Sequence, residues 1–242
     1  MHDPHILCHD LKKWNIELSD KQIGQFMDYY DLLTEWNSFM NLTAITEFED
    51  VCKKHFVDSL SIVKAVSFEK RDTQKISLID VGTGAGFPGI PLAIVFPELE
   101  ITLLDSLQKR IHFLDHVIEK LALANCKTIH GRAEDFAKEN LLREKFDYCV
   151  SRAVANLSTL SEYCLPYVKP GGYFVSYKSE KIADEAKKAE HAIQILGGVF
   201  DNQVSFTLPD SDLYRNLYVI RKENHTPKKY PRKAGLPSKD PM

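Results

Sequence analysis

The stretch Ile76-Ser-Leu-Ile-Asp-Val-Gly-Thr-Gly-Ala-Gly-Phe-Pro-Gly89 predicts a buried strand, then a glycine-rich turn, then the start of a helix. Glycine lets the backbone pass close to a ligand, because it has no Cβ and adopts a positive φ at little cost. The turn follows the carboxyl end of a strand, which is where open α/β sheets bind nucleotides. Glycine turns also serve packing alone, so the stretch by itself leaves a nucleotide site and a plain turn equally open.

A carboxylate at the end of the next strand favours the nucleotide site. The strand is expected over 100–105 and ends in Asp105, at the spacing of about 20 residues from which an acid binds ribose hydroxyls. Asp105 is therefore a candidate ribose ligand. Asp105 or Ser106 equally suits the N-cap of a helix expected from Gln108 to Leu123. The two roles are compatible.

The spacing of the glycines separates two kinds of cofactor. A dinucleotide site requires G-x-G-x-x-G, so that the helix N-terminus receives the pyrophosphate. Here Gly82, Gly84 and Gly86 are spaced G-x-G-x-G after Asp80. This arrangement resembles the first motif of S-adenosylmethionine-dependent methyltransferases, in which no pyrophosphate is bound. An NAD-dependent oxidoreductase and a cofactor-binding module without catalysis remain the alternatives of other classes.

An acidic pair follows the third expected strand, over 127–130. It belongs to the sequence Gly131-Arg-Ala-Glu-Asp135. In the methyltransferase fold, an acidic residue here resembles the position that contacts adenine. The other interpretation is that Glu134 and Asp135 lie in the first turn of a helix, where the helix dipole favours negative charge.

Composition agrees with one medium-sized enzyme. The chain has 242 residues, 44% of them hydrophobic, and a net charge of −3, so it is long enough to bury a substantial core. No stretch reaches the roughly 18–20 consecutive apolar residues of a membrane span, and the first residues lack a signal region. We therefore expect a cytoplasmic protein that does not bind a membrane.

Cysteine and histidine spacing gives no indication of a metal site. The five cysteines are widely spaced and form no C-x-x-C pair, so we expect them to be reduced and packed in the interior. The nine histidines are not combined with a cysteine pair at zinc spacing. We expect no metal.

The chain divides into three parts. Residues 1–70 are expected to form a helical extension packed on the core, because Ser19 to Gln22 reads as a capping box followed by apolar residues at helical spacing. Residues 71–224 alternate strands and helices, which predicts a largely parallel α/β sheet covered on both faces. Residues 225–242 form a basic tail with proline and glycine. This tail suits either RNA phosphates or a solvated terminus.

The fourth expected strand, over 146–150, is followed by Ser-Arg-Ala at 151–153. Methyltransferases that act on exocyclic amino groups usually carry Asn/Asp-Pro-Pro-aromatic here, and this chain does not. Cys149 and Cys164 lie in apolar segments, so a nucleophile for pyrimidine C5 chemistry is not evident, and buried packing is the favoured interpretation of both.

These motifs together resemble the small-subunit ribosomal RNA guanine-N7 methyltransferase family, also called RsmG or glucose-inhibited division protein B. The match extends beyond the glycine-rich core to Trp-Asn-x-x-x-Asn-Leu-Thr at 36–43, His-Phe-Val-Asp-Ser at 55–59, Ser-Tyr-Lys at 176–178 and Tyr-Pro-Arg-Lys-Ala-Gly at 230–235. It covers nearly the whole chain. The first and last of these are the most discriminating.

The resemblance implies a Rossmann-like class I methyltransferase with a mostly parallel seven-stranded sheet. It implies transfer of a methyl group from S-adenosyl-L-methionine to N7 of a guanosine in 16S ribosomal RNA. We also expect the protein to act as a monomer without a metal. The partner is 16S ribosomal RNA or the small ribosomal subunit. The alternative within the class is a methyltransferase of another RNA or a small molecule.

The resemblance and the residue patterns together give the candidate site residues. For the cofactor they are Gly82, Gly84, Gly86, Phe87, Asp105, Ala133, Glu134 and Arg152. For the substrate they are Asn37, Asn41, His55, Ser59, Lys178, Arg232 and Lys233.

Lys178 and Arg152 are the catalytic candidates. We expect Lys178 to face RNA near the reaction centre. The fork of Arg152 suits the cofactor carboxylate, a substrate phosphate or a neighbouring acid. No catalytic base is expected, because the lone pair of guanine N7 carries no proton at neutral pH and catalysis then rests on alignment.

Overall fold

The computed structural model describes residues 2–68, 75–138, 140–152, 155–179 and 182–242. The expected boundary between residues 70 and 71 and the residue Ala153 lie outside these ranges.

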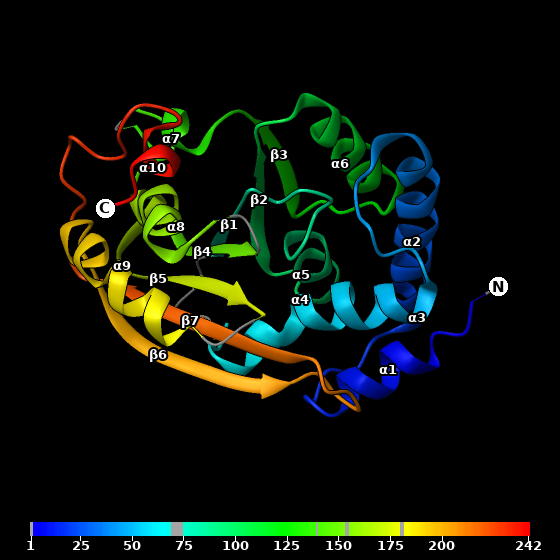
Figure 1. The fold of residues 1–242 in the computed structure, drawn as a ribbon. Coiled ribbons are helices and arrows are strands. Elements are labelled where there is room, and N and C mark those ends of the chain that lie inside the picture. The colour runs from blue at the N-terminus through cyan, green and yellow to red at the C-terminus, as the bar shows by residue number, and fades with distance from the viewer. Residues whose placement is uncertain (1, 69–74, 139, 153–154, 180–181) are drawn as a thin grey trace.

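A seven-stranded mixed sheet forms the centre of the molecule (Figure 1). Its strands are β1 (Ile76–Val81), β2 (Leu99–Asp105), β3 (Cys126–His130), β4 (Phe146–Arg152), β5 (Val168–Lys178), β6 (Gly198–Thr207) and β7 (Tyr214–Lys222). The order is β3-β2-β1-β4-β5-β7-β6. The first five strands in this order are parallel, and β7 runs antiparallel to both of its neighbours. The prediction of a mostly parallel α/β sheet is confirmed.

Helices cover both faces of the sheet, as the near-continuous apolar runs of the parallel strands require. On one face lie α8 (Leu157–Cys164), a 3₁₀ turn (Leu165–Tyr167) and α9 (Ala183–Ile195), with α7 (Ala133–Phe136) and α10 (Leu236–Lys239) beside α8 (Figure 1). On the other lie α5 (Gly89–Val95), α6 (Gln108–Lys120) and the N-terminal helices. Successive side chains of β1 point to opposite faces of the sheet. Leu78 therefore packs into one core and Ile79 into the other.

The N-terminal helices are α1 (His5–Lys12), α2 (Asp20–Met40), α3 (Phe48–Val51), a π-helical turn (Cys52–Val57), α4 (Asp58–Leu60) and a 3₁₀ turn (Ser61–Lys64). The capping box at the start of α2 is confirmed: the Ser19 side chain accepts from the Gln22 amide and the Gln22 side chain accepts from the Ser19 amide. Phe26, Tyr30 and Leu33 are buried. This layer packs through α2 on α5 and α6, and therefore borders the glycine-rich turn.

Some boundaries differ from the sequence expectations. The helix expected from Gln108 to Leu123 ends at Lys120, because the chain turns through Ala122 at a positive φ. The edge strand β6 was not predicted from the residue pattern. Side chains of β6 are mostly exposed, so it lacks the apolar run that marks the other strands. Among the described residues, no helix is long and apolar enough to cross a membrane.

Candidate cofactor-binding site

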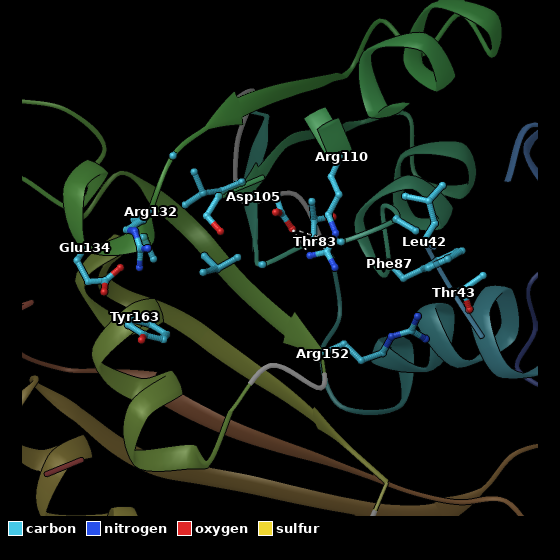
Figure 2. A pocket seen from close by; sticks show the side chains of 18 of the residues that line it. Leu42, Thr43, Thr83, Phe87, Asp105, Arg110, Arg132, Glu134, Arg152 and Tyr163 are labelled. Atoms are coloured by element: carbon cyan, nitrogen blue, oxygen red, sulfur yellow. Dashed lines mark hydrogen bonds and ion pairs between the residues drawn. The ribbon is translucent and has the colours of Figure 1, made fainter. Parts of the chain in front are cut away.

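A cavity of about 480 Å³ opens at the carboxyl ends of β1, β2 and β4. Figure 2 shows its side chains in three groups. The Asp105 region contains Gly82, Gly84, Asp105 and Arg110; the Glu134 region contains Ala133, Glu134 and Tyr163; the Phe87 region contains Thr43, His55, Phe87 and Arg152. The size falls within the range of about 300–1,000 Å³ for small-molecule sites.

The glycine-rich turn is held from below by Asp80. One oxygen of this buried carboxylate accepts from the Thr83 hydroxyl (2.7 Å) and from the Gly89 amide at the start of α5 (2.9 Å). The other oxygen is buried and has no hydrogen-bond partner among the described residues. Burial raises the pKa of Asp80 to about 6, although these two hydrogen bonds oppose the rise. Asp80 therefore shapes the turn from inside the protein and does not line the cavity.

The glycines of the turn have two different roles. Gly82 and Gly84 line the cavity with φ values of 73° and 64°, in the left-handed region. Gly86 points into the core: a Cβ there would lie 2.6 Å from Ile90 and 2.7 Å from the Tyr29 hydroxyl. Gly86 was expected among the cofactor residues, but it does not line the cavity. Its lack of a side chain serves packing.

Asp105 joins the glycine turn to the loop after β2. Its carboxylate accepts from the Gly84 amide (2.9 Å) and the Leu107 amide (2.9 Å), and one Arg110 nitrogen lies 3.3 Å away. A carboxylate has about four acceptor positions, so one remains for a ligand hydroxyl. The predicted N-cap role is wrong, because α6 begins after Leu107 and has no side-chain cap.

The Glu134 region depends on parts of the chain far apart in sequence. Glu134 lies in the first turn of α7 and is 7% exposed. Its carboxylate accepts from the Gly235 amide at 2.8 Å. The backbone oxygen of Ala133 accepts from the Tyr167 hydroxyl (2.6 Å), which fixes the start of α7. Tyr163 of α8 lies opposite Glu134 (Figure 2).

In the Phe87 region, an imidazole ring and a guanidinium group pack against the phenyl ring of Phe87. The His55 ring lies parallel to that of Phe87, with centroids 4.5 Å apart, and the Arg152 guanidinium lies 5.1 Å from the Phe87 centroid. The Nε2 atom of His55 is 2.8 Å from the Thr43 hydroxyl. Burial, together with the nearby Arg152 charge, lowers the pKa of His55 to about 3. His55 is therefore neutral at physiological pH.

Arg152 forms an ion pair with a neighbouring acid, which is one of its three expected roles. It donates to Asp58 at 2.9 Å and to the Lys54 carbonyl at 3.2 Å. Asp58 is 5% exposed and accepts a second arginine, Arg215 of β7, at 2.8 Å. Two guanidinium groups thus share one carboxylate, so the Phe87 region carries an excess of one positive charge.

Lys178 differs from its expected place. It ends β5 but does not line the cavity. Its ammonium donates to Glu185 of α9 at 2.7 Å and to the Ala155 carbonyl at 2.8 Å, and its side chain is 13% exposed. Glu185 also accepts from the Leu157 amide at the start of α8. In this structure Lys178 is held by Glu185 and the Ala155 carbonyl and is not an exposed cation.

Three other substrate candidates have local structural roles. The Asn37 side chain accepts from the Thr43 amide (2.9 Å), and Asn41 caps α2 in the left-handed conformation. Ser59 is fully buried and donates to the His55 carbonyl (2.6 Å), so RNA cannot reach it here. Asn37 and Ser59 support the loop and helix that carry Thr43 and His55.

The two basic tail candidates differ from each other. Arg232 forms a double hydrogen bond with Glu162 of α8, which is 1% exposed. Lys233 is exposed, and its side chain has no ion pair among the described residues. The expectation that Arg232 contacts RNA phosphates is therefore not met, because its charge is used inside the protein.

One group of potential metal ligands is formed by residues that do not line the cavity. His9, Asp10 and Asp210 bring their ligand atoms within 4.8 Å of one another. Lys13 already pairs with Asp210, and Lys53 with Asp10 at 2.7 Å. These ammonium groups neutralise the carboxylates, so the group is an ion-pair cluster.

Sequence reasoning missed several cavity residues. They are Leu42, Arg110, Arg132 and Tyr163, and Arg215 behind Asp58. The sequence could have indicated Arg110, because it lies in the first turn of the helix expected after Asp105. Tyr163 and Arg215 had none, because only the folding of α8 and β7 onto the sheet brings them to the site.

Comparison with known proteins identifies the family. The GidB family model, described as rRNA small subunit methyltransferase G, matches residues 22–214. Proteins named Ribosomal RNA small subunit methyltransferase G from Lachnoclostridium phytofermentans and Alkaliphilus oremlandii are 52% and 54% identical to the chain. These alignments cover 100% and 98% of this chain, and 98% of each relative.

Solved structures agree on the fold. A SAM dependent methyltransferase from Aquifex aeolicus superposes with a TM-score of 0.51 at 16% identity, over 71% of this chain and 92% of that one. A predicted O-methyltransferase from Agrobacterium tumefaciens gives a TM-score of 0.51 at 18% identity, over 70% and 81% of the two chains. At full length the sequence relationship is far closer, and the chain belongs to the rRNA small subunit methyltransferase G family.

Proposed function

We propose that this enzyme transfers the methyl group of S-adenosylmethionine to N7 of a guanosine in 16S ribosomal RNA of the small subunit. The observation that carries the proposal is the cavity at the carboxyl edge of the sheet in a chain whose relatives, named for ribosomal RNA methylation, match it over nearly its full length. Family membership leaves no support for the oxidoreductase or the non-catalytic alternative.

The residues of the cavity fit this cofactor. The remaining acceptor position of Asp105 suits a ribose hydroxyl. Gly82 and Gly84 allow the backbone to approach the ligand. Glu134 offers an acceptor for the adenine amino group. When bound, S-adenosylmethionine supplies an electrophilic methyl group on its sulfonium.

The Phe87 region is the proposed side for the target base. Its excess positive charge suits an anionic RNA, and its rings suit a flat base. Guanine N7 holds an unprotonated lone pair, so the enzyme needs neither a base nor a metal. With a pKa of about 3, His55 is a poor proton acceptor, which agrees with a reaction in which no side chain has to accept a proton. Fixed alignment alone contributes on the order of 7–11 kcal/mol to lowering such barriers.

Arg152 is the proposed alignment residue for this step. Its contacts with Asp58, Lys54 and the Phe87 ring hold it against the cavity. We also propose that the enzyme acts as a monomer and that Lys233, which is exposed, contacts RNA phosphates.

Labelled methyl incorporation tests the proposal. Purified protein is incubated with S-adenosylmethionine carrying a radioactive methyl group and with small subunits from cells that lack this gene. Parallel reactions contain free 16S RNA and transfer RNA. We expect label in the 16S RNA only. Label in transfer RNA alone would support the other-RNA alternative, and no label in any RNA would contradict RNA methylation.

A further inference from the structure

The end of the chain is bound to the wall of the cofactor cavity. Residues 230–242, here called the C-terminal segment, pack along α8, and α10 within it contacts α8 directly (Figure 1). Pro237 is buried, and its carbonyl accepts from the Thr159 side chain of α8 at 3.0 Å. Ser158 of the same helix donates to the carboxyl-terminal Met242. These contacts pack the segment against α8, so it is not a solvated terminus.

Arg232 is the main anchor of this segment. Its amide donates to Glu162 at 2.7 Å, and its guanidinium donates to both oxygens of the same carboxylate, at 3.0 Å from Nε and 2.8 Å from Nη2. Nη2 also donates to the Asp240 carbonyl at 2.8 Å. A carboxylate as buried as Glu162 requires a charged partner. Arg232 therefore fixes both the start and the end of the segment on α8.

Downstream of Arg232, the C-terminal segment contacts a side chain that lines the cavity. The Gly235 amide donates to Glu134 at 2.8 Å, and Glu134 lines the cavity. The Ser238 hydroxyl donates to the Gly235 carbonyl at 3.1 Å, which helps to fix the backbone at Gly235. Gly235 takes a φ of +86°, and the position where its Cβ would lie is open space, so the requirement for glycine here concerns the backbone conformation.

We propose that the C-terminal segment is part of the cofactor site: Arg232 holds Gly235 in place, and Gly235 orients Glu134 toward the adenosine part of the cofactor. The inference rests on the proposed function, because it takes the Glu134 region to receive S-adenosylmethionine. Arg232 is then a positioning residue for cofactor binding. It does not contact the cofactor or the RNA.

Cofactor affinity distinguishes this role from RNA binding. S-adenosylhomocysteine is titrated into the full-length protein by calorimetry, and the variants are Arg232→Gln and Lys239→Gln. Lys239 is an exposed cation of the same segment. We expect Kd to rise about tenfold in Arg232→Gln, as for the loss of a charge-assisted hydrogen bond, and to stay within about twofold in Lys239→Gln.

Arg232→Gln leaves the buried Glu162 carboxylate without its charged partner, which destabilises the fold. A second pair of variants avoids this effect. Gly235→Asn retains the left-handed conformation, which asparagine tolerates, whereas Gly235→Val disfavours it strongly. In both variants the added Cβ meets no atom within 4 Å. We expect Gly235→Val to weaken S-adenosylhomocysteine binding about fivefold or more, and Gly235→Asn to restore affinity close to that of the wild type.

Steady-state kinetics separates positioning from a general loss of structure. In Gly235→Val we expect the KM for S-adenosylmethionine to rise while kcat at saturating cofactor stays near the wild-type value. A fall in kcat with an unchanged KM would overturn the inference. So would an unchanged Kd in both Arg232→Gln and Gly235→Val, and so would reduced RNA affinity at an unchanged Kd for the cofactor product. If the wild-type protein itself binds no S-adenosylhomocysteine, the proposed function fails, and not only this inference.

Discussion

The Asp105 region and the Glu134 region of the cavity are assembled in different ways. The Asp105 region comes from one continuous stretch, in which β1, the glycine turn, β2 and the start of α6 follow one another. The Glu134 region needs α7, α8 and the C-terminal segment, which supplies Gly235 about a hundred residues beyond Glu134. A local motif can therefore specify one end of a ligand site, while the other end depends on the complete fold.

The largest expected effect concerns the glycine turn. Gly86→Ala places a Cβ 2.6 Å from Ile90 at a φ of +97°, so strain and overpacking add and should lower the free energy of unfolding by roughly 2–5 kcal/mol. Gly84→Ala has the same kind of backbone but open space around the Cβ, and should cost about 1–2 kcal/mol. Urea denaturation of both variants measures the difference. Equal losses would contradict the packing role of Gly86.

Asp105→Ala tests the local end of the cavity. The variant leaves the Gly84 and Leu107 amides without their acceptor and removes the proposed ribose contact. We expect the Kd for S-adenosylhomocysteine to rise about a hundredfold, which corresponds to roughly 2.7 kcal/mol. Asp105→Asn keeps one acceptor oxygen, so its Kd should rise less than that of Asp105→Ala. Calorimetric affinity within a few-fold of the wild type for Asp105→Ala would remove Asp105 from the site.

Arg152 and Arg215 form a natural matched pair, because both bind Asp58 and only Arg152 lines the cavity. Substitution of either by glutamine weakens a buried ion pair and should destabilise the fold by a similar amount. Methyl transfer at saturating cofactor should fall about tenfold more in Arg152→Gln than in Arg215→Gln, as for loss of one aligning interaction. Equal kcat values for the two variants would leave Arg152 with a structural role alone.

The smallest expected effect is a pH dependence that originates at His55. Its folded-state pKa is about 3, against about 6.5 in an unfolded chain. Between these values only the unfolded state binds the proton, so acidification from pH 7.5 to pH 5.8 should lower the free energy of unfolding by about 1 kcal/mol. His55→Gln should lose this part of the acid sensitivity.

Asp80 acts in the opposite direction in this range, because its raised pKa of about 6 makes the folded state bind the proton first. Asp80 is present in both proteins, so its contribution cancels when wild type and His55→Gln are compared by denaturant unfolding at the two pH values. Identical pH dependence in the two proteins would show that His55 is not held neutral.

The fold was largely predictable from the sequence, because strand and helix periods are local properties. The glycine turn, the acid after β2 and the capping box of α2 were all readable from neighbouring residues. β6 was not, because an edge strand with exposed side chains has no apolar run.

The site was predictable only where it is local. Asp105 and the cavity glycines were identified from spacing, and Glu134 from its place after β3. Lys178 and Arg232 looked like exposed cations, since the sequence does not show which acid will fold against them. Glu185 and Glu162 are those acids, and only the packing of α8 and α9 on the sheet brings them into contact.

The most direct test of the central claim is to identify the methylated atom. Small subunits that lack the modification are treated with wild-type protein and S-adenosylmethionine, with Asp105→Ala as control, and the 16S RNA is then cleaved chemically at 7-methylguanosine. The account predicts one new cleavage site that depends on the wild-type protein. Incorporation of methyl label without any such cleavage would contradict transfer to guanine N7.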